Sequence, residues 1–166
     1  QIMTATADEL LQGLSASRVS IVTFERGQNL WRYTAPRIRA KLPRVLPEAP
    51  IFNRLRESQG VFNTDDVRTE PDLTSVLEML GENARALLIL PLASGGILNA
   101  LVFVQLVGEN RFGINELEVA RTITNQASIA LENARLYQSS VRMADRFAVL
   151  NETSSLVSAS LNPEEV

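Results

Sequence analysis

The sequence predicts an α/β domain of the α+β type, in which an antiparallel sheet has the first and last helices on one face and short helices and loops on the other. Three observations carry this prediction. Two strongly apolar strand segments, 85–92 and 97–107, are separated by a Gly-rich turn. A shorter β-hairpin is indicated at 19–34. A long helix begins near Ile114 and meets no Pro or Gly before Pro163.

The N-terminal segment has the apolar spacing of one short amphipathic helix. Its apolar residues recur at intervals of three and four, and the helix is expected to end near Gly13: Met3, Ala7, Leu10 and Leu14. The next segment, 19–25, is rich in β-branched and aromatic residues, and a polar turn at 26–29 leads to a similar segment at 30–34. This pattern predicts a β-hairpin.

Prolines and basic residues alternate through the stretch 36–50, where four prolines disfavour a helix. The basic residues in and just before this stretch are Arg32, Arg37, Arg39, Lys41 and Arg44. No Gly-rich or helix-opening segment accompanies them to direct backbone N–H groups at a phosphate. We therefore expect a solvated, mobile loop rather than an anion or nucleic-acid site.

Two short helices and a turn are expected before the long strands. Apolar spacing predicts one helix at 51–58, which ends before Gly60, and another at 73–80, which ends at Gly81. Between them the sequence reads Asn-Thr-Asp-Asp at 63–66. The paired aspartates raise a metal-site hypothesis. An Asx turn is the favoured interpretation, because short polar side chains bond to nearby backbone N–H groups.

The final helix is predicted to be apolar on two nearly opposite sides. Gly113 takes the N-cap position, with Glu116 three residues later as a weakened capping box. One face carries small residues that allow close approach to the sheet: Ile123, Ala127, Ala130 and Ala134. The other side repeats every seven residues and is joined by Phe147: Ile129, Leu136, Met143, Leu150 and Val157. We expect this second stripe to form a homodimer interface; the alternative is that it covers a following domain.

Composition excludes several classes of function. The 166 residues include no Cys and no His, which removes thiolate and imidazole catalysis, disulfides and the usual zinc sites, so no enzyme and no cofactor are expected. The net charge of −3 disfavours nucleic acid as a partner. The longest apolar run, 86–93, is too short for insertion into a membrane, and no signal peptide opens the chain, so we expect a cytoplasmic domain.

Two stretches carry a resemblance to a known family. The first comprises 85–92, Gly95 to Ile97 and 101–104. The second comprises Phe112, 116–118 and the run Asn-Gln-Ala-Ser-Ile-Ala-Leu-Glu-Asn-Ala-Arg-Leu-Tyr at 125–137. Together they resemble GAF domains of bacterial multidomain signalling proteins, such as sensor histidine kinases. The resemblance covers 1–138, and 139–166 looks like a helical linker and the start of a following domain.

The resemblance concerns the residues that form the fold rather than residues that bind a particular ligand. Ala100 stands where the family often has Gly, and Gly113 stands where it often has Ser or Thr. The family includes proteins that bind bilins, haem or cyclic nucleotides, and methionine sulfoxide reductases. Without Cys and His, a thioether-linked bilin, His-ligated haem and the reductase chemistry are excluded. The cyclic-nucleotide motif is only partly matched, by Asn110, Arg111, Phe112, Asn115 and Glu116.

A pocket is predicted on the sheet face away from the terminal helices. Ala100, Val102 and Val104 are small enough to face the alanine stripe of the final helix, and strand alternation then turns their neighbours the other way. The predicted lining is mostly apolar, although each member could equally be core: Phe52, Leu55, Phe62, Leu73, Leu77, Asn99, Leu101, Phe103 and Gln105.

The resemblance implies a domain that senses a small molecule or relays a signal, and that regulates an output domain of the same parent chain through a long dimeric helix. A ligand-free dimerisation and relay module is the alternative. An enzyme is the third hypothesis and the weakest, because no catalytic constellation remains without His and Cys.

Overall fold

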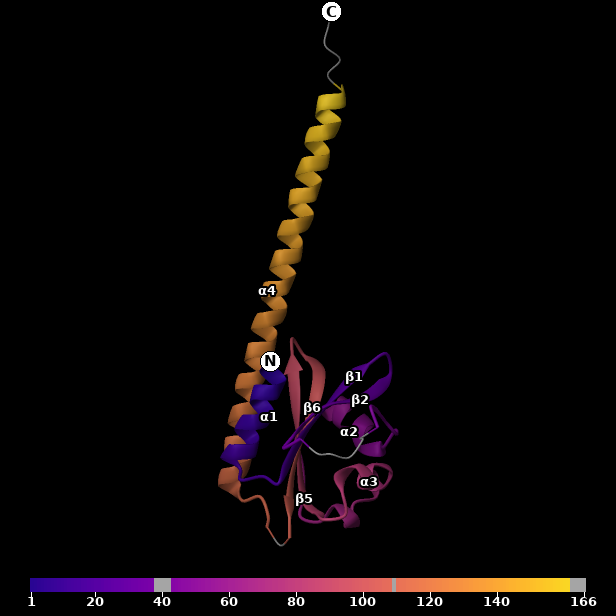
Figure 1. The fold of residues 1–166 in the computed structure, drawn as a ribbon, viewed down its shortest axis with the longest axis vertical. Helices are drawn as coiled ribbons and strands as arrows, with labels where there is room; N and C mark the ends of the chain where they lie inside the picture. The colour runs from indigo at the N-terminus through magenta and orange to yellow at the C-terminus, as the bar shows by residue number, and fades with distance from the viewer. Residues whose placement is uncertain (38–42, 109, 162–166) are drawn as a thin grey trace, which may run out of the picture. The chain divides into compact units, whose positions relative to one another are not determined.

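Six antiparallel strands form one sheet, in the order β3-β2-β1-β6-β5-β4, in the computed structural model of this chain (Figure 1). The structure describes residues 1–37, 43–108 and 110–161. It divides into two units, 1–131 and 132–166, and the sheet belongs to the first. The strands are β1 (Arg18–Glu25), β2 (Gln28–Ala35), β3 (Val45–Leu46), β4 (Phe62–Thr64), β5 (Ala84–Ser94) and β6 (Ile97–Val107). The predicted antiparallel sheet is confirmed.

The hairpin of β5 and β6 forms the middle of the sheet. Gly95 and Gly96 connect the strands with φ angles of 57° and 76°, a backbone conformation that glycine adopts without steric cost. Both strands are buried along most of their length, as expected for a sheet covered on both faces. The pairing shifts by one residue between Ala84 and Ala86, so Arg85 lies at an irregularity of β5.

One face of the sheet packs against the helices from the two ends of the first unit (Figure 1). These are α1 (Ile2–Gly13) and the portion of α4 (Ile114–Leu161) that lies before residue 132. Ala100, Val102 and Val104 share a buried cluster with Ala120 and Ala127 of α4. The predicted orientation of β6 is therefore confirmed.

The opposite face is covered by α2 (Pro50–Ser58), two 3₁₀ helices and α3 (Leu77–Leu80). The 3₁₀ helices are η1 (Val67–Thr69) and η2 (Pro71–Val76). The prediction of one α-helix over 73–80 is wrong, because only its last turn is α-helical. In a 3₁₀ helix, residues three apart share one side, so Leu73 and Val76 both reach the core without an α-helical turn.

The stretch expected to be a loop also contains structure. Within 36–50, Val45 and Leu46 form β3, which pairs with Leu30 and Asn29 of β2. Arg37 and Arg44 are exposed, as a solvated basic stretch requires. Arg39 and Lys41 lie outside the described residues, so the prediction of a mobile loop stays a prediction.

Helix α4 begins where the capping pattern predicts. Gly113 accepts the first hydrogen bond of the helix, from the backbone N–H of Leu117 at 3.1 Å. In the second unit, Arg135 binds Glu132 through two hydrogen bonds of 3.0 and 2.7 Å. The predicted start of a following domain includes 162–166, which lie outside the described residues. No helix of the described residues has the length and apolar content needed to cross a membrane.

Candidate functional site

The structure brings most of the predicted pocket residues together. Six of them belong to one buried cluster between the sheet and the short helices: Phe52, Leu55, Phe62, Leu73, Leu101 and Phe103. The ring of Phe52 packs against two other aromatic rings, with its centroid 6.5 Å from that of Phe24 and 6.2 Å from that of Phe103. Leu77 packs against the cluster and is partly buried. These side chains form core packing on the predicted face.

The two polar residues of the predicted lining lie apart from each other, at opposite ends of β6. Asn99 is next to the β5–β6 turn, where it donates hydrogen bonds to Ser94 Oγ at 2.7 Å and Ile97 O at 3.2 Å. Gln105 is close to the other end and is 2% exposed. They cannot both contact one small ligand at the centre of the sheet, because they are six residues apart on an extended strand.

A cavity of about 510 Å³ lies beside the buried cluster. Its lining residues come from η1, α3, the turn after α3 and the start of β5: Val67, Arg68, Leu77, Glu78, Gly81, Glu82 and Ala84. Leu77 is the predicted pocket residue among them. Sequence reasoning missed the charged lining residues, since a run of apolar core positions carries no signal for a cavity at its edge.

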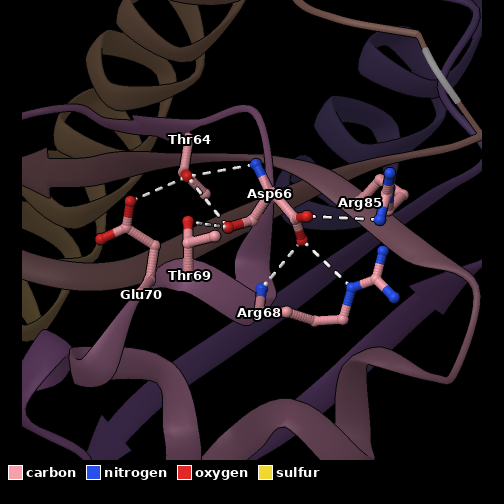
Figure 2. Close-up of polar contacts among 6 residues, drawn as sticks. All are labelled: Thr64, Asp66, Arg68, Thr69, Glu70 and Arg85. Atoms are coloured by element: carbon pink, nitrogen blue, oxygen red, sulfur yellow. Dashed lines mark hydrogen bonds and ion pairs between the residues drawn. The ribbon is translucent and has the colours of Figure 1, made fainter.

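The turn expected at 63–66 positions one of these charged residues. Asp66 Oδ1 accepts hydrogen bonds from the backbone N–H of Arg68 at 3.1 Å and from Arg68 Nε at 3.2 Å (Figure 2). The first of these bonds caps η1 and confirms the predicted Asx turn. Because the second bond holds the guanidinium, Asp66 fixes how Arg68 borders the cavity.

The other side of Asp66 binds the sheet. Its Oδ2 forms an ion pair of 3.2 Å with Arg85 Nη1, from the irregularity at the start of β5. Figure 2 shows Asp66 between the two arginines, with Thr64, Thr69 and Glu70 around it. Thr64 Oγ1 lies 2.9 Å from Glu70 Oε1 and accepts the backbone N–H of Asp66 at 3.3 Å. One turn therefore links η1, β4 and β5.

Hydrogen bonding lowers the pKa of Asp66. The backbone N–H of Arg68 is the largest cause, and the side chain of Arg68 adds a hydrogen bond and a positive charge, while partial burial acts in the opposite direction. The carboxylate is thus the stable form at neutral pH, and both arginine contacts require it. Because folding favours that ionised form, the contribution of Asp66 to stability is present above the ordinary aspartate pKa and is lost as the pH falls.

The cavity lining offers charged groups that can bind a small polar ligand. Arg68 offers a guanidinium, and Glu78 and Glu82 offer carboxylates, which suits a small polar ligand. In the part of the chain that the structure describes, no group of three or more His, Cys, Asp or Glu residues is placed to hold a metal ion. The paired aspartates at 65 and 66 bind arginines instead.

The family profile of GAF domains matches residues 1–132. The chain belongs to the GAF domain family. GAF domains are typically non-catalytic sensory modules. The matched region includes all six strands, the Asp66 turn and the 510 Å³ cavity.

Solved GAF domain structures share this fold at low sequence identity. The GAF domain of PixJ from Thermosynechococcus elongatus, in its blue-light absorbing form, is 15% identical with a TM-score of 0.75, and the match covers 87% of this chain and 91% of that one. The domain named GAF3 of a Synechocystis sp. PCC6803 protein, in its photoproduct state, is 22% identical with a TM-score of 0.67. The match covers 83% of this chain and 96% of that one.

A GAF domain from a two-component sensor histidine kinase of Bacillus halodurans is 12% identical, with a TM-score of 0.63 over 82% of this chain and 97% of that one. At these identities the likeness shows the fold alone. No protein of curated function matches the sequence. The chain is therefore a GAF domain with the α+β fold of these structures.

Proposed function

We propose that this GAF domain responds to a small molecule and relays the signal to an output domain of the same parent chain through a dimeric helix. The observation that carries the proposal is the apolar stripe on α4. Its members are each at least 49% exposed: Ile129, Leu136, Met143, Leu150 and Val157. Exposed apolar side chains in a continuous stripe are typical of an interaction surface.

The spacing of this stripe suits a parallel two-stranded coiled coil. If the stripe occupies the d positions of a heptad, the a positions are Asn133, Ser140, Phe147, Ser154 and Leu161. An asparagine at one a position is a known device for selecting an in-register dimer at a cost in stability. The proposed interface thus combines apolar d positions with both polar and apolar a positions. Such an interface suits a helix that changes its packing during signalling.

The alternative partner for the stripe is a following domain of the parent chain. A heptad seam packs against a helix that has the same repeat, whereas a globular surface has no reason to require strict seven-residue spacing over five positions. The spacing therefore favours a second copy of α4 over a following domain.

The central strands offer a route from the cavity side to α4. Along β6, Leu101 and Phe103 belong to the cluster beneath the short helices, whereas Val102 and Val104 belong to the cluster beneath α1 and α4. A ligand that shifts the packing on one side also moves side chains on the other, because both sets extend from one strand. Its effect is limited to the difference in its affinity for the two packing states.

A ligand-free dimerisation and relay module is the second candidate. The observation that favours it is the close packing of the predicted pocket centre, where Phe52, Leu73 and Phe103 are fully buried. Native mass spectrometry of the purified chain separates the two candidates. A co-purifying small molecule supports sensing, and a homodimer that binds no metabolite from a cell extract supports the ligand-free module.

A histidine kinase is the output domain suggested by the Bacillus halodurans neighbour.

The dimer is tested by cross-linking, because the chain contains no cysteine. In a parallel in-register coiled coil, Met143→Cys places two thiols close enough for a disulfide. We expect rapid formation of a covalent dimer under mild oxidation. Asp145→Cys is the matched control. Position 145 lies two residues after Met143, a rotation of about 200° around the helix, so it faces away from the seam. Equal cross-linking of both variants, or none with Met143→Cys, would contradict the proposal.

A further inference from the structure

Arg18 and Gln105 are direct neighbours across two strands at one end of the sheet. Arg18 begins β1 and pairs with Gln105 near the end of β6. Side chains of an opposed pair point to the same face, which here is the face of Leu101 and Phe103. The pair therefore lies on the cavity side of the sheet.

The side chain of Gln105 has an unmet hydrogen-bonding capacity. The residue is 2% exposed, and among the described residues its Nε2 is the one buried side-chain nitrogen or oxygen atom without a hydrogen-bond partner. A buried amide without a partner is costly, and native proteins rarely retain one without a reason. Rotation about the terminal bond exchanges Nε2 and Oε1, so the donor can turn toward a bound acceptor.

Arg18 forms no ion pair with the carboxylates that the structure describes. In the described part of the chain, three arginines are half-buried. Arg56 lies 3.7 Å from Glu48, and Arg85 lies 3.2 Å from Asp66. Arg18 has no described carboxylate within ion-pair distance, and its Nη1 donates to the carbonyl of Met79 at 3.3 Å. Burial lowers the pKa of Arg18, as expected for a cation without a compensating anion.

Both side chains line one small cavity of about 170 Å³. Ser17, Glu82 and Asn83 are among the other lining residues. This volume is below the roughly 300–1,000 Å³ of pockets for drug-sized ligands, so the space suits a small organic molecule. Gly81, Glu82 and Ala84 also line the 510 Å³ cavity, so the two spaces adjoin.

We propose that this cavity binds the carboxylate group of a small organic acid no larger than an amino acid, with the Arg18 guanidinium and the Gln105 amide as donors. A guanidinium presents parallel N–H groups that match the two oxygens of a carboxylate. Glu82 on the same wall disfavours a dianion such as phosphate and favours a monoanion or a zwitterion. This inference rests on the proposed sensing function and specifies its ligand class.

Nuclear magnetic resonance of the ¹⁵N-labelled chain tests the site directly. Acetate, L-alanine, succinate and inorganic phosphate are each titrated to millimolar concentrations. The side-chain amide signals of Gln105 are followed in the parent chain, and the backbone amide signals of Glu82 and Asn83, which also line the cavity, are followed in every variant. We expect a saturable shift with acetate or L-alanine. No saturable shift with acetate or L-alanine, or a shift with succinate or phosphate alone, would overturn the proposal.

Two variants separate binding from folding. Gln105→Met keeps the length of the side chain and removes the unpaired amide. The unliganded variant should therefore gain thermal stability, and its affinity for the acid should fall. Arg18→Gln should weaken binding at least about tenfold, because charged hydrogen bonds contribute most to such contacts. Arg26→Gln removes an exposed charge in the β1–β2 turn and should bind as the parent chain does. Unchanged affinity in Gln105→Met would contradict the assignment.

Failure of this site can be told apart from failure of the sensing function. Cross-linking of Met143→Cys is measured with and without saturating acid. A saturable shift at Gln105 with unchanged cross-linking supports the site and contradicts relay through α4. Normal cross-linking with no shift at Gln105 overturns the site and leaves the dimeric helix intact.

Discussion

Asp66 accepts two hydrogen bonds from Arg68, one from its backbone N–H at 3.1 Å and one from its Nε at 3.2 Å. The same carboxylate pairs with Arg85 at 3.2 Å, so a single side chain joins the 3₁₀ helix η1 to the strand β5. The hydrogen bonds from Arg68 explain why the pKa of Asp66 is lowered, and they make the turn sensitive to acid.

The first prediction concerns this acid sensitivity. Asp66→Asn keeps the size of the side chain and removes its charge, so the variant should be less stable than the parent chain at neutral pH. The difference in free energy of unfolding between variant and parent should shrink as the pH falls below 3.8, the ordinary pKa of aspartate. The parent carboxyl then becomes neutral as well. Urea unfolding at several pH values measures this.

Asp145→Asn is the control for that experiment, because Asp145 is an exposed residue of α4 that forms no ion pair with the described residues. Its effect on stability should be small. If Asp66→Asn differs from the parent chain by the same free energy of unfolding at every pH measured, the turn does not depend on the charge of Asp66.

The second prediction concerns the stripe on α4. Leu136→Glu with Met143→Glu places like charges along the proposed seam, where they lose hydration without gaining partners. We expect dimer affinity to fall by at least about 100-fold, because burying an unpaired charge costs several kcal/mol. Sedimentation measures the association, and circular dichroism should show that the β-sheet remains folded.

Gln138→Glu is the matched control, since it adds the same charge on the far side of the helix from Leu136. It should leave the dimer intact. A parent chain that is monomeric at tens of micromolar, or a double variant that unfolds instead of dissociating, would contradict the role assigned to the stripe.

The third prediction compares two phenylalanines of opposite exposure. Phe103 is fully buried between the sheet and the short helices, whereas Phe147 of α4 is 65% exposed. Phe103→Ala should lower the free energy of unfolding by about 3–5 kcal/mol, because it removes apolar contacts and leaves a cavity. Phe147→Ala should leave the unfolding of the sheet nearly unchanged and weaken dimerisation. Similar effects of the two changes on chemical denaturation would argue against this division.

The fourth prediction concerns Gly81, which separates α3 from β5. Its φ of 90° and ψ of 156° lie in a region that is essentially reserved for glycine, and an added Cβ would lie 3.3 Å from Arg18 Nη2. Gly81→Ala should destabilise the domain by about 1–3 kcal/mol. Thermal unfolding measures this, with Gly60→Ala as the control, since an added Cβ there meets only ordinary contacts. Equal melting temperatures for the two variants would show that the turn adapts.

Local patterns in the sequence determined much of this fold. The alternation of apolar side chains along β6 separates the faces of Val102 and Phe103, and the Gly95-Gly96 turn marks the hairpin. The seven-residue spacing on α4 and the absence of Cys and His are equally readable from the chain alone. Each of these signals depends on neighbours in sequence, which is why it needs no tertiary information.

Only the tertiary structure decided where cavities lie and which polar groups meet. The opposition of Arg18 and Gln105 depends on the register between β1 and β6, and no local pattern specifies that register. That Arg18 has no ion pair among the described residues likewise depends on where distant chain segments fold. The 3₁₀ form of Pro71–Val76 follows from packing that overrides a helical apolar spacing. Burial and pairing across strands are properties of the whole fold, so the sequence predicted the apolar core beneath the short helices. Of the residues that line the two cavities, it predicted Leu77 and Gln105 and missed the charged ones.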